Sequence, residues 1–288
     1  MQFRMGCAVW AFKGWVGEFY PAGSRASDFL RLYGDRLLTV EGNTTFYSVP
    51  NEETVARWAA ETPPDFRFCL KVPRDVTHSG LLAPAMTKAI AFAERMAGLG
   101  ERLGPFFAQL PPSYGPAQFE DLAAFVAAWP QGIAPLAVEV RHPQWFTPAG
   151  DRRLNELLQS HGVGRVILDT RAIYSGSDDP QANSQRRKPK LPLQPAVTAP
   201  FALVRFISHP DRPRNQDFLA EWVTRVRDWL AQGTEVYFFV HCPEEVYSPG
   251  TARWFQKMLE AQQVPVPPLP WNQPEQAPEP EPDQLSLF

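Results

Sequence analysis

The stretch Leu37-Leu38-Thr39-Val40-Glu41-Gly42-Asn43-Thr44-Thr45-Phe46-Tyr47-Ser48-Val49-Pro50 shows the unit from which the fold is built. Its apolar start, Leu37 to Val40, predicts a buried strand, and the strand ends in a carboxylate, an amide, hydroxyl groups and a phenol. After Pro50, the sequence Asn51-Glu52-Glu53-Thr54 predicts a helix with acidic residues in its first turn. A strand end of this kind either carries a site or merely satisfies a turn.

The same unit recurs along the chain. Strands are predicted at residues 3–9, 37–40, 66–71, 106–110, 136–141, 166–169, 201–207 and 236–241. Helical patterns are predicted at residues 27–37 with Ser27 as cap, from 51 onward, and at 84–102, 117–129, 154–161, 218–232 and 252–262. Eight strands alternating with helices predict a single α/β domain, a TIM (β/α)8-type barrel over residues 1–263.

Polar residues follow most of these strands. In a TIM barrel the carboxyl ends of all strands meet at one face, so we expect these side chains to surround one cleft. Charged groups there are costly to bury unless they pair with each other or serve a function. The predicted catalytic residues are Glu41, His78, Glu139 and Asp169, and the predicted substrate-binding or anion-binding residues are Trp10, Asn43, Tyr47, Lys71, Arg141, Arg205 and His241.

Several motifs carry a family resemblance. They are Trp10 and Trp15 with Gly17-Glu18-Phe19-Tyr20-Pro21, the segment Glu41 to Pro50, Trp58 with Thr62-Pro63 and Phe66, Lys71 with Thr77-His78, and Glu139-Val140-Arg141. In these motifs the chain resembles the YecE-like family, also called domain of unknown function 72, from about residue 3 to residue 263. The resemblance implies a TIM barrel. It leaves the reaction open, because the family has no established activity.

The charge of the chain is nearly balanced, with 28 basic and 31 acidic residues. No global basic field therefore indicates nucleic acid as a partner. A local basic run, Arg186-Arg187-Lys188-Pro189-Lys190, falls between the sixth and seventh predicted strands. It is either a solvated loop or a segment over the barrel mouth that receives phosphate.

The three cysteines, Cys7, Cys69 and Cys242, form no CxxC pair, and the first residues predict a strand rather than a secretory leader. We therefore expect a reduced, cytoplasmic protein. Cys242 follows His241, which fits either a packed thiol or a reactive one. The sequence contains no run of 18 apolar residues, so it predicts no membrane span.

Three kinds of function fit these residues. Metal chemistry would use ligands such as Glu41, His78, Glu139, Asp169, His209 and His241. However, no HxH or HxxxH spacing occurs, and several cationic side chains are predicted at the same end of the barrel. We therefore expect a pocket without metal or cofactor.

The expected activity is that of a hydrolase or lyase that acts on a phosphate-bearing or nucleic-acid-derived substrate, with Glu41 or Glu139 as general base. A glycosidase would need these two carboxylates about 5 to 9.5 Å apart, and strands two and five lie far apart around the ring. A non-catalytic binding module is the third possibility.

The C-terminal part, residues 264–288, has a different composition. Prolines recur at positions 265, 267, 268, 270, 274, 278, 280 and 282 among acidic residues and glutamines, which predicts a disordered linker. The final residues Gln284-Leu285-Ser286-Leu287-Phe288 turn apolar and resemble the peptide that binds the sliding clamp of bacterial DNA polymerase. The resemblance implies that Gln284, Leu285, Leu287 and Phe288 contact the clamp, which would place the protein in replication or repair.

Overall fold

Eight parallel strands form the centre of the fold in a computed structural model that describes residues 2–182 and 187–272. They are β1 Phe3–Cys7, β2 Thr39–Gly42, β3 Arg67–Leu70, β4 Phe106–Gln109, β5 Leu136–Glu139, β6 Gly164–Asp169, β7 Phe201–Ile207 and β8 Glu235–His241. Their hydrogen-bonded order is β3-β2-β1-β8-β7-β6-β5-β4. Isolated parallel bridges, Phe68 to Leu103 and Lys71 to Phe107, span the gap between β3 and β4. The sheet is thus a nearly closed barrel, which confirms the predicted fold.

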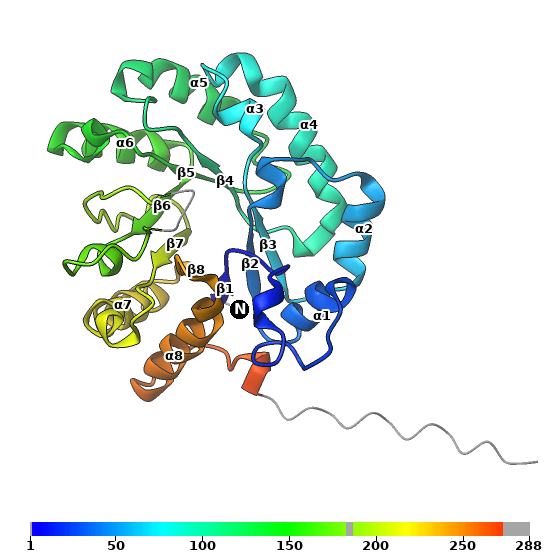
Figure 1. The fold of residues 1–288 in the computed structure, drawn as a ribbon. Helices are drawn as coiled ribbons and strands as arrows, with labels where there is room; N and C mark the ends of the chain where they lie inside the picture. Colours follow the sequence, from blue (N-terminus) through cyan, green and yellow to red (C-terminus); the bar gives the residue numbers. More distant parts are fainter. Residues whose placement is uncertain (1, 183–186, 273–288) are drawn as a thin grey trace, which may run out of the picture.

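Helices surround this barrel (Figure 1). They are α1 Phe29–Gly34, α2 Glu52–Ala60, α3 Arg74–Thr77, α4 Met86–Met96, α5 Phe119–Ala128, α6 Pro148–Ser160, α7 Gln216–Ala231 and α8 Ser248–Ala261. The predicted start of α2 is confirmed, because the side chain of Asn51 accepts a hydrogen bond from the Thr54 amide at 2.9 Å. The predicted cap at Ser27 is wrong. A 3₁₀ turn at Ala26–Asp28 precedes α1, and Asp28 rather than Ser27 bonds the Arg25 amide.

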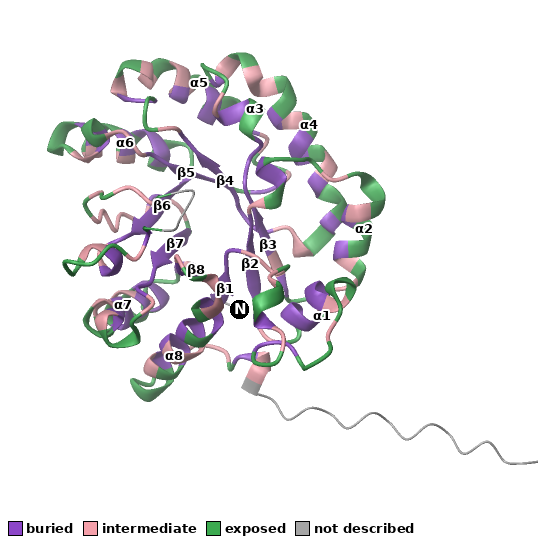
Figure 2. Ribbon diagram, in the orientation of Figure 1, coloured by how far each residue is buried: buried purple, intermediate pink, exposed green. Residues whose placement is uncertain are grey.

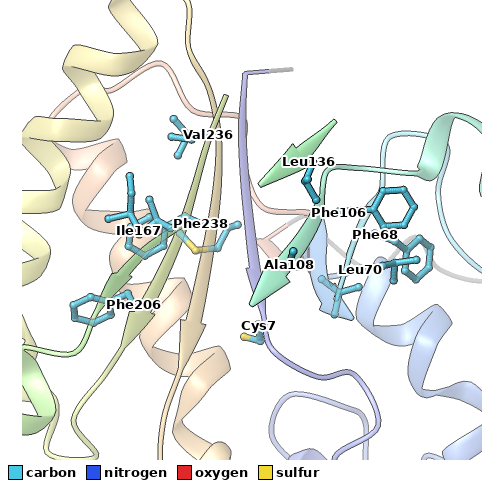
Figure 3. Packing of buried hydrophobic residues seen from close by; sticks show 14 of the residues in the cluster. Cys7, Phe68, Leu70, Phe106, Ala108, Leu136, Ile167, Phe206, Val236 and Phe238 are labelled. Carbon is cyan, nitrogen blue, oxygen red and sulfur yellow. The ribbon is translucent and has the colours of Figure 1, made fainter. Parts of the chain in front are cut away.

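Side chains on the two faces of the strands form two separate apolar layers. Outward residues such as Phe106 and Phe238 are labelled in Figure 3. They pack against the helix residues Phe92 and Phe255. Inward residues fill the barrel in a second cluster of Cys69, Phe107, Ala137, Val166, Phe201, Leu203, Tyr237 and Phe239. Figure 2 shows that the strands are buried while the outer helix faces are exposed. Because side chains alternate along a strand, every second residue beyond the inner layer points into the barrel mouth.

Residues 264–272 pack on the outside of the barrel, whereas the sequence predicted a disordered linker from residue 264. Val264 and Leu269 are buried, and the Gln256 side chain donates to the Pro267 carbonyl at 2.9 Å. The Trp271 ring lies 4.8 Å from the ring of Phe19. Apolar side chains between the prolines therefore dock on the barrel, with a 3₁₀ helix at Pro270–Asn272 as the regular structure of the segment. The remaining tail, including Gln284 to Phe288, lies outside the described residues.

We predict that Leu269→Ala lowers the free energy of unfolding by about 2 to 4 kcal/mol, because it opens a cavity at a fully buried position. Gln262→Ala removes an exposed side chain just before this stretch and should change stability by less than about 0.5 kcal/mol. Urea denaturation of both variants measures the difference. Equal stabilities would show that residues 264–272 do not pack on the barrel.

Candidate functional site

Arg205 on β7 is the centre of a buried ion-pair network at the carboxyl ends of the strands. Its Nε and Nη2 donate to the two carboxylate oxygens of Glu41 on β2, each at 2.7 Å. Its Nη1 donates to Glu139 on β5. All three side chains are buried. One guanidinium therefore ties together three strands that are not neighbours in the barrel.

The network continues on both sides of Arg205. On the Glu139 side, Arg141 Nε donates to Glu139 at 2.7 Å and Arg141 Nη2 donates to Gln109 Oε1 at 2.7 Å. The same Gln109 oxygen accepts from Lys71 Nζ at 3.0 Å. On the other side, Glu41 contacts His241 Nε2 at 2.8 Å and accepts from Asn43 Nδ2 at 2.7 Å. The structure thus brings together seven of the predicted residues: Glu41, Asn43, Lys71, Glu139, Arg141, Arg205 and His241.

Both carboxylates of the network are held in the ionised form. Burial by itself would raise the pKa of Glu41, but Arg205 and His241 outweigh it and hold that pKa well below its usual range. Burial is likewise outweighed at Glu139, where Arg205 and Arg141 lower the pKa to about 2. A general base should have a pKa near the working pH. The carboxylates predicted to be catalytic are therefore better suited to positioning the guanidinium groups.

Lys71 differs from the other charged residues of the network, because it pairs with no carboxylate of the described residues. Its side chain is buried, and within the described residues no Asp or Glu oxygen lies within 4.0 Å of its amine. The amine instead lies 4.0 Å from the centre of the Phe46 ring. Burial, and then the charge of Arg205, lower the pKa of Lys71 to about 7. A substantial fraction of this lysine is therefore uncharged at neutral pH.

Two further titratable groups approach the mouth from loops. Lys188, from the connection between β6 and β7, is half-buried and interacts electrostatically with Arg205 and Glu41, and burial lowers its pKa to about 8. Its backbone is anchored by Gln181, whose Oε1 accepts from the Lys188 amide at 2.6 Å. Glu245, after β8, has an Oε1 atom that is buried without a hydrogen-bond partner among the described residues. Burial raises the pKa of Glu245 to about 8.

The other described members of the basic run contact the loop rather than the mouth. Arg187 pairs with Asp179 at 2.6 Å, and the Lys190 amine lies 5.6 Å from the Tyr174 ring centre. Among residues 187–190, the electrostatic contacts with the network belong to Lys188. The prediction that this loop lies over the mouth therefore holds for one lysine.

Asp169 does not join the network, contrary to the prediction. It is buried on the outer side of β6, where it accepts hydrogen bonds from Trp222 Nε1 of α7 at 2.8 Å and from Arg171 Nη2 at 2.9 Å. The reason is the alternation of the strand: Ile167, two residues earlier, belongs to the outward layer of Figure 3, and Leu168 pairs with Arg205. Asp169 therefore connects the barrel to its helices.

Trp10 packs in the outward apolar layer, whereas Tyr47 and His78 lie on the loops after β2 and β3. Trp10 packs against Trp58, with ring centres 5.2 Å apart. Tyr47 and His78 line a cavity of about 580 Å³ between the loops after β2 and β3. Its lining consists of Thr45, Phe46, Tyr47, Ser48, Val49, Pro73, Arg74, Asp75, His78 and Ser79. Phe46 thus separates the amine of Lys71 from this cavity, whose size suits a small ligand.

His78 is uncharged at neutral pH. Burial, and then the charge of Lys71, lower its pKa to about 4. Its Nδ1 lies 2.9 Å from the Thr77 hydroxyl, and its ring centre lies 5.0 Å from that of Phe46. His78 is therefore a neutral polar group next to the apolar wall of Lys71.

Gln109 was recognised as a polar residue at a strand end, but it was not among the predicted site residues. It is buried and accepts from both Arg141 and Lys71. Counting in steps of two from Phe107, an inward residue, would have found it. Glu245 was also missed, and it lies in a 3₁₀ segment that no sequence signal marks.

Two kinds of feature are absent from the described residues. Within residues 2–182 and 187–272, no three His, Cys, Asp or Glu side chains form a group that could hold a metal ion. In the same residues, no helix has the length and the apolar character needed to cross a bilayer. The groups at the mouth are amines, guanidinium groups, amides, carboxyl groups and the imidazole of His241.

Comparisons with known proteins agree on one family. Residues 4–274 match the family model described as "Protein of unknown function DUF72". The UPF0759 protein YecE of Escherichia coli K12 is 37% identical over 223 residues, which cover 76% of this chain and 81% of that protein. The UPF0759 protein YunF of Bacillus subtilis is 25% identical over 173 residues, 57% of this chain and 61% of YunF. A crystal structure of a DUF72 family protein from Thermotoga maritima superposes with a TM-score of 0.68 at 24% identity, covering 90% of this chain and 100% of that chain.

We predict that Arg205→Met lowers the free energy of unfolding by about 3 to 5 kcal/mol at pH 8, because it leaves two buried carboxylates without their shared cation. In the wild type, the lowered pKa values of Glu41 and Glu139 contribute stability above about pH 4.5 that is lost as the pH falls toward 2. In the variant, both pKa values should rise, and protonation should relieve the repulsion. The loss should therefore be smaller at pH 5 than at pH 8.

Urea denaturation at the two pH values measures this effect. Arg153→Met is the matched control, because it breaks an exposed ion pair with Glu120 and should cost less than about 1 kcal/mol at either pH. A loss in Arg205→Met that is the same at pH 5 and pH 8 would contradict the assigned role of Arg205.

Proposed function

The chain belongs to the DUF72 family of proteins of unknown function, and we propose that its barrel mouth binds the anionic group of a small substrate. The proposed activity is that of a hydrolase or lyase acting on a phosphate-bearing, carboxylate-bearing or nucleic-acid-derived compound. The anion would lie against Lys71, Arg141 and Lys188.

The charge balance of the mouth carries this proposal. Two carboxylates, Glu41 and Glu139, are matched by two guanidinium groups, Arg205 and Arg141. Lys71 and Lys188 remain as additional cations that the described carboxylates do not neutralise through an ion pair. An anion supplies the missing negative charge, and amines together with a forked guanidinium are suitable donors for phosphate or carboxylate oxygens.

Proton transfer in this site is best assigned to the groups that titrate near neutral pH. The pKa of Lys71 is about 7, and those of Lys188 and Glu245 are about 8. This assignment replaces the expectation that Glu41 or Glu139 is the general base. It also disfavours a glycosidase that uses this pair, because such an enzyme needs one protonated carboxyl group and Arg205 keeps both ionised.

A binding module without catalysis is the alternative, and the same geometry supports it. Such a module would use Lys71, Arg141 and Lys188 only to hold the anion. The two functions differ in what Lys71→Met does. In the module it lowers affinity alone, whereas in the enzyme it also abolishes turnover of a bound substrate.

We predict that sulfate binds more weakly as the pH rises from 6 to 9, by about tenfold or more, because Lys71 and Lys188 lose their protons in this range. Sulfate keeps its charge between pH 6 and pH 9, so a change in its affinity over this range comes from groups of the protein. Isothermal titration calorimetry measures the affinity. Lys188→Gln should weaken binding about tenfold at pH 6, while Lys190→Gln, from the same loop, should leave it unchanged. An affinity independent of both pH and Lys188 would refute the anion site.

We further propose that the C-terminal peptide tethers the protein to the sliding clamp of bacterial DNA polymerase. The support is the sequence Gln284-Leu285-Ser286-Leu287-Phe288, which follows a segment rich in proline and acidic residues. Three large apolar side chains offer about 1.5 to 3 kcal/mol each on burial, and ordering the peptide takes back part of this. The expected affinity of the peptide alone is about micromolar.

We predict that a chain ending at Asp283 loses binding to a purified bacterial sliding clamp, because it lacks all four proposed contact residues. Surface plasmon resonance with immobilised clamp compares it with the full chain. Leu287→Ala with Phe288→Ala should have the same effect, while Glu279→Gln in the preceding segment should bind like the wild type. Clamp binding by the truncated chain, or none by the full chain, would show that the motif is a coincidence.

A further inference from the structure

We propose that Lys71 is a nucleophile that forms an imine with an aldehyde or ketone group of the substrate. This inference deepens the proposed function. It names a carbonyl compound as the substrate class, and it relies on the anion site only to hold such a compound beside Lys71.

The position of Lys71 is fixed by backbone contacts on both sides. It directly follows β3, and its amide donates to the Gly42 carbonyl at 3.1 Å. Its own carbonyl accepts from the Thr45 hydroxyl at 2.7 Å, and a parallel bridge joins Lys71 to Phe107 on β4. The backbone that carries the side chain is therefore held rigidly, which fixes the direction in which the amine points at the mouth. A nucleophile needs such a fixed position.

The surroundings favour the uncharged amine, which is the nucleophilic form. A buried ammonium group is costly unless a carboxylate compensates it, and the nearby carboxylates Glu41 and Glu139 are already bound by guanidinium groups. Among the described residues, the Lys71 amine donates to Gln109 Oε1, an oxygen that also accepts from Arg141. Deprotonation of Lys71 thus leaves this oxygen with a partner. The lowered pKa of Lys71, about 7, agrees with this geometry.

The amine is also placed between an apolar wall and cationic groups. The Phe46 ring contacts it at 4.0 Å, and Arg141 shares its amide acceptor. A substrate with a carbonyl group next to a carboxylate or phosphate would place its anionic end on Arg141 and Lys188. Its carbonyl carbon would then face the amine of Lys71. This arrangement suits an anionic aldehyde or ketone better than a neutral one.

The covalent step is balanced without an oxidant or a reductant. The nitrogen lone pair of Lys71 forms a bond to the carbonyl carbon while the carbon–oxygen π bond breaks, and proton transfer from nitrogen to oxygen gives a carbinolamine. Loss of the hydroxyl group with a second proton as water gives the C=N bond. The protonated imine withdraws electrons from the neighbouring bonds, which is the activation that a lyase requires.

Reductive trapping tests the inference in the full-length protein. Glyoxylate is the anionic aldehyde, propionaldehyde is the neutral one, and sodium cyanoborohydride reduces any imine to a stable amine. Mass spectrometry of peptides then reports each lysine, because every trapped imine adds the mass of the aldehyde less one oxygen atom. We expect glyoxylate to label Lys71 at least tenfold faster than Lys88, which is exposed and paired with Asp75. We also expect sulfate to protect Lys71.

Lys71→Met should abolish this labelling and keep the wild-type circular dichroism spectrum, while Lys88→Met should be labelled at Lys71 like the wild type. If sulfate binds and Lys71 reacts no faster than Lys88, the inference is overturned and the anion site stands. If both aldehydes label Lys71 equally fast and sulfate gives no protection, the nucleophile stands and the anion site is overturned. If Lys71→Met does not fold, protection of Lys71 by sulfate in the wild type decides the question.

Discussion

The shared contact of Glu41 and Glu139 with one guanidinium, that of Arg205, is the constraint on which the rest of the mouth depends. It joins β2, β5 and β7, and it removes both buried carboxylates from any pairing with an amine. Lys71 is left buried beside cations, and its acceptor is an amide oxygen. The chemistry of the site therefore depends on the pairing of Glu41 and Glu139 with Arg205, which leaves Lys71 without a carboxylate partner among the described residues. A buried network is costly to assemble and specifies one arrangement when every member is bonded.

The fold and most of the site could be predicted because both depend on local patterns. Strand β7 was predicted with its observed bounds, and the positions of Glu41 and Lys71 at the ends of predicted strands placed them at the mouth. The prediction for Asp169 was wrong because a position at a strand end does not determine which face of the strand a side chain occupies. The roles of Glu41 and Glu139 could not be predicted either. Their pKa values depend on Arg205, which lies 164 and 66 residues away along the chain.

Where the chain leaves the barrel, its composition did not predict which residues pack against other parts of the protein. The prolines of residues 264–272 indicated an extended segment without helix or strand, but they did not show that Leu269 and Trp271 would find partners. A similar limit applies to the basic run, in which Lys188 faces the network while Arg187 and Lys190 contact the loop. In both segments the outcome depends on surfaces formed by distant parts of the chain. A count of prolines or charges does not describe those surfaces.

The two proposals for the mouth are linked through charge. Burial, together with the guanidinium groups of the mouth, favours the neutral form of Lys71, which is the form that attacks a carbonyl group. The protonated imine that follows carries the positive charge that this environment disfavours in the ammonium form. The anionic group of the substrate, held by Arg141 and Lys188, offsets that charge. A substrate with both a carbonyl and an anionic group thus stabilises the intermediate that it forms, whereas a neutral carbonyl compound lacks this compensation.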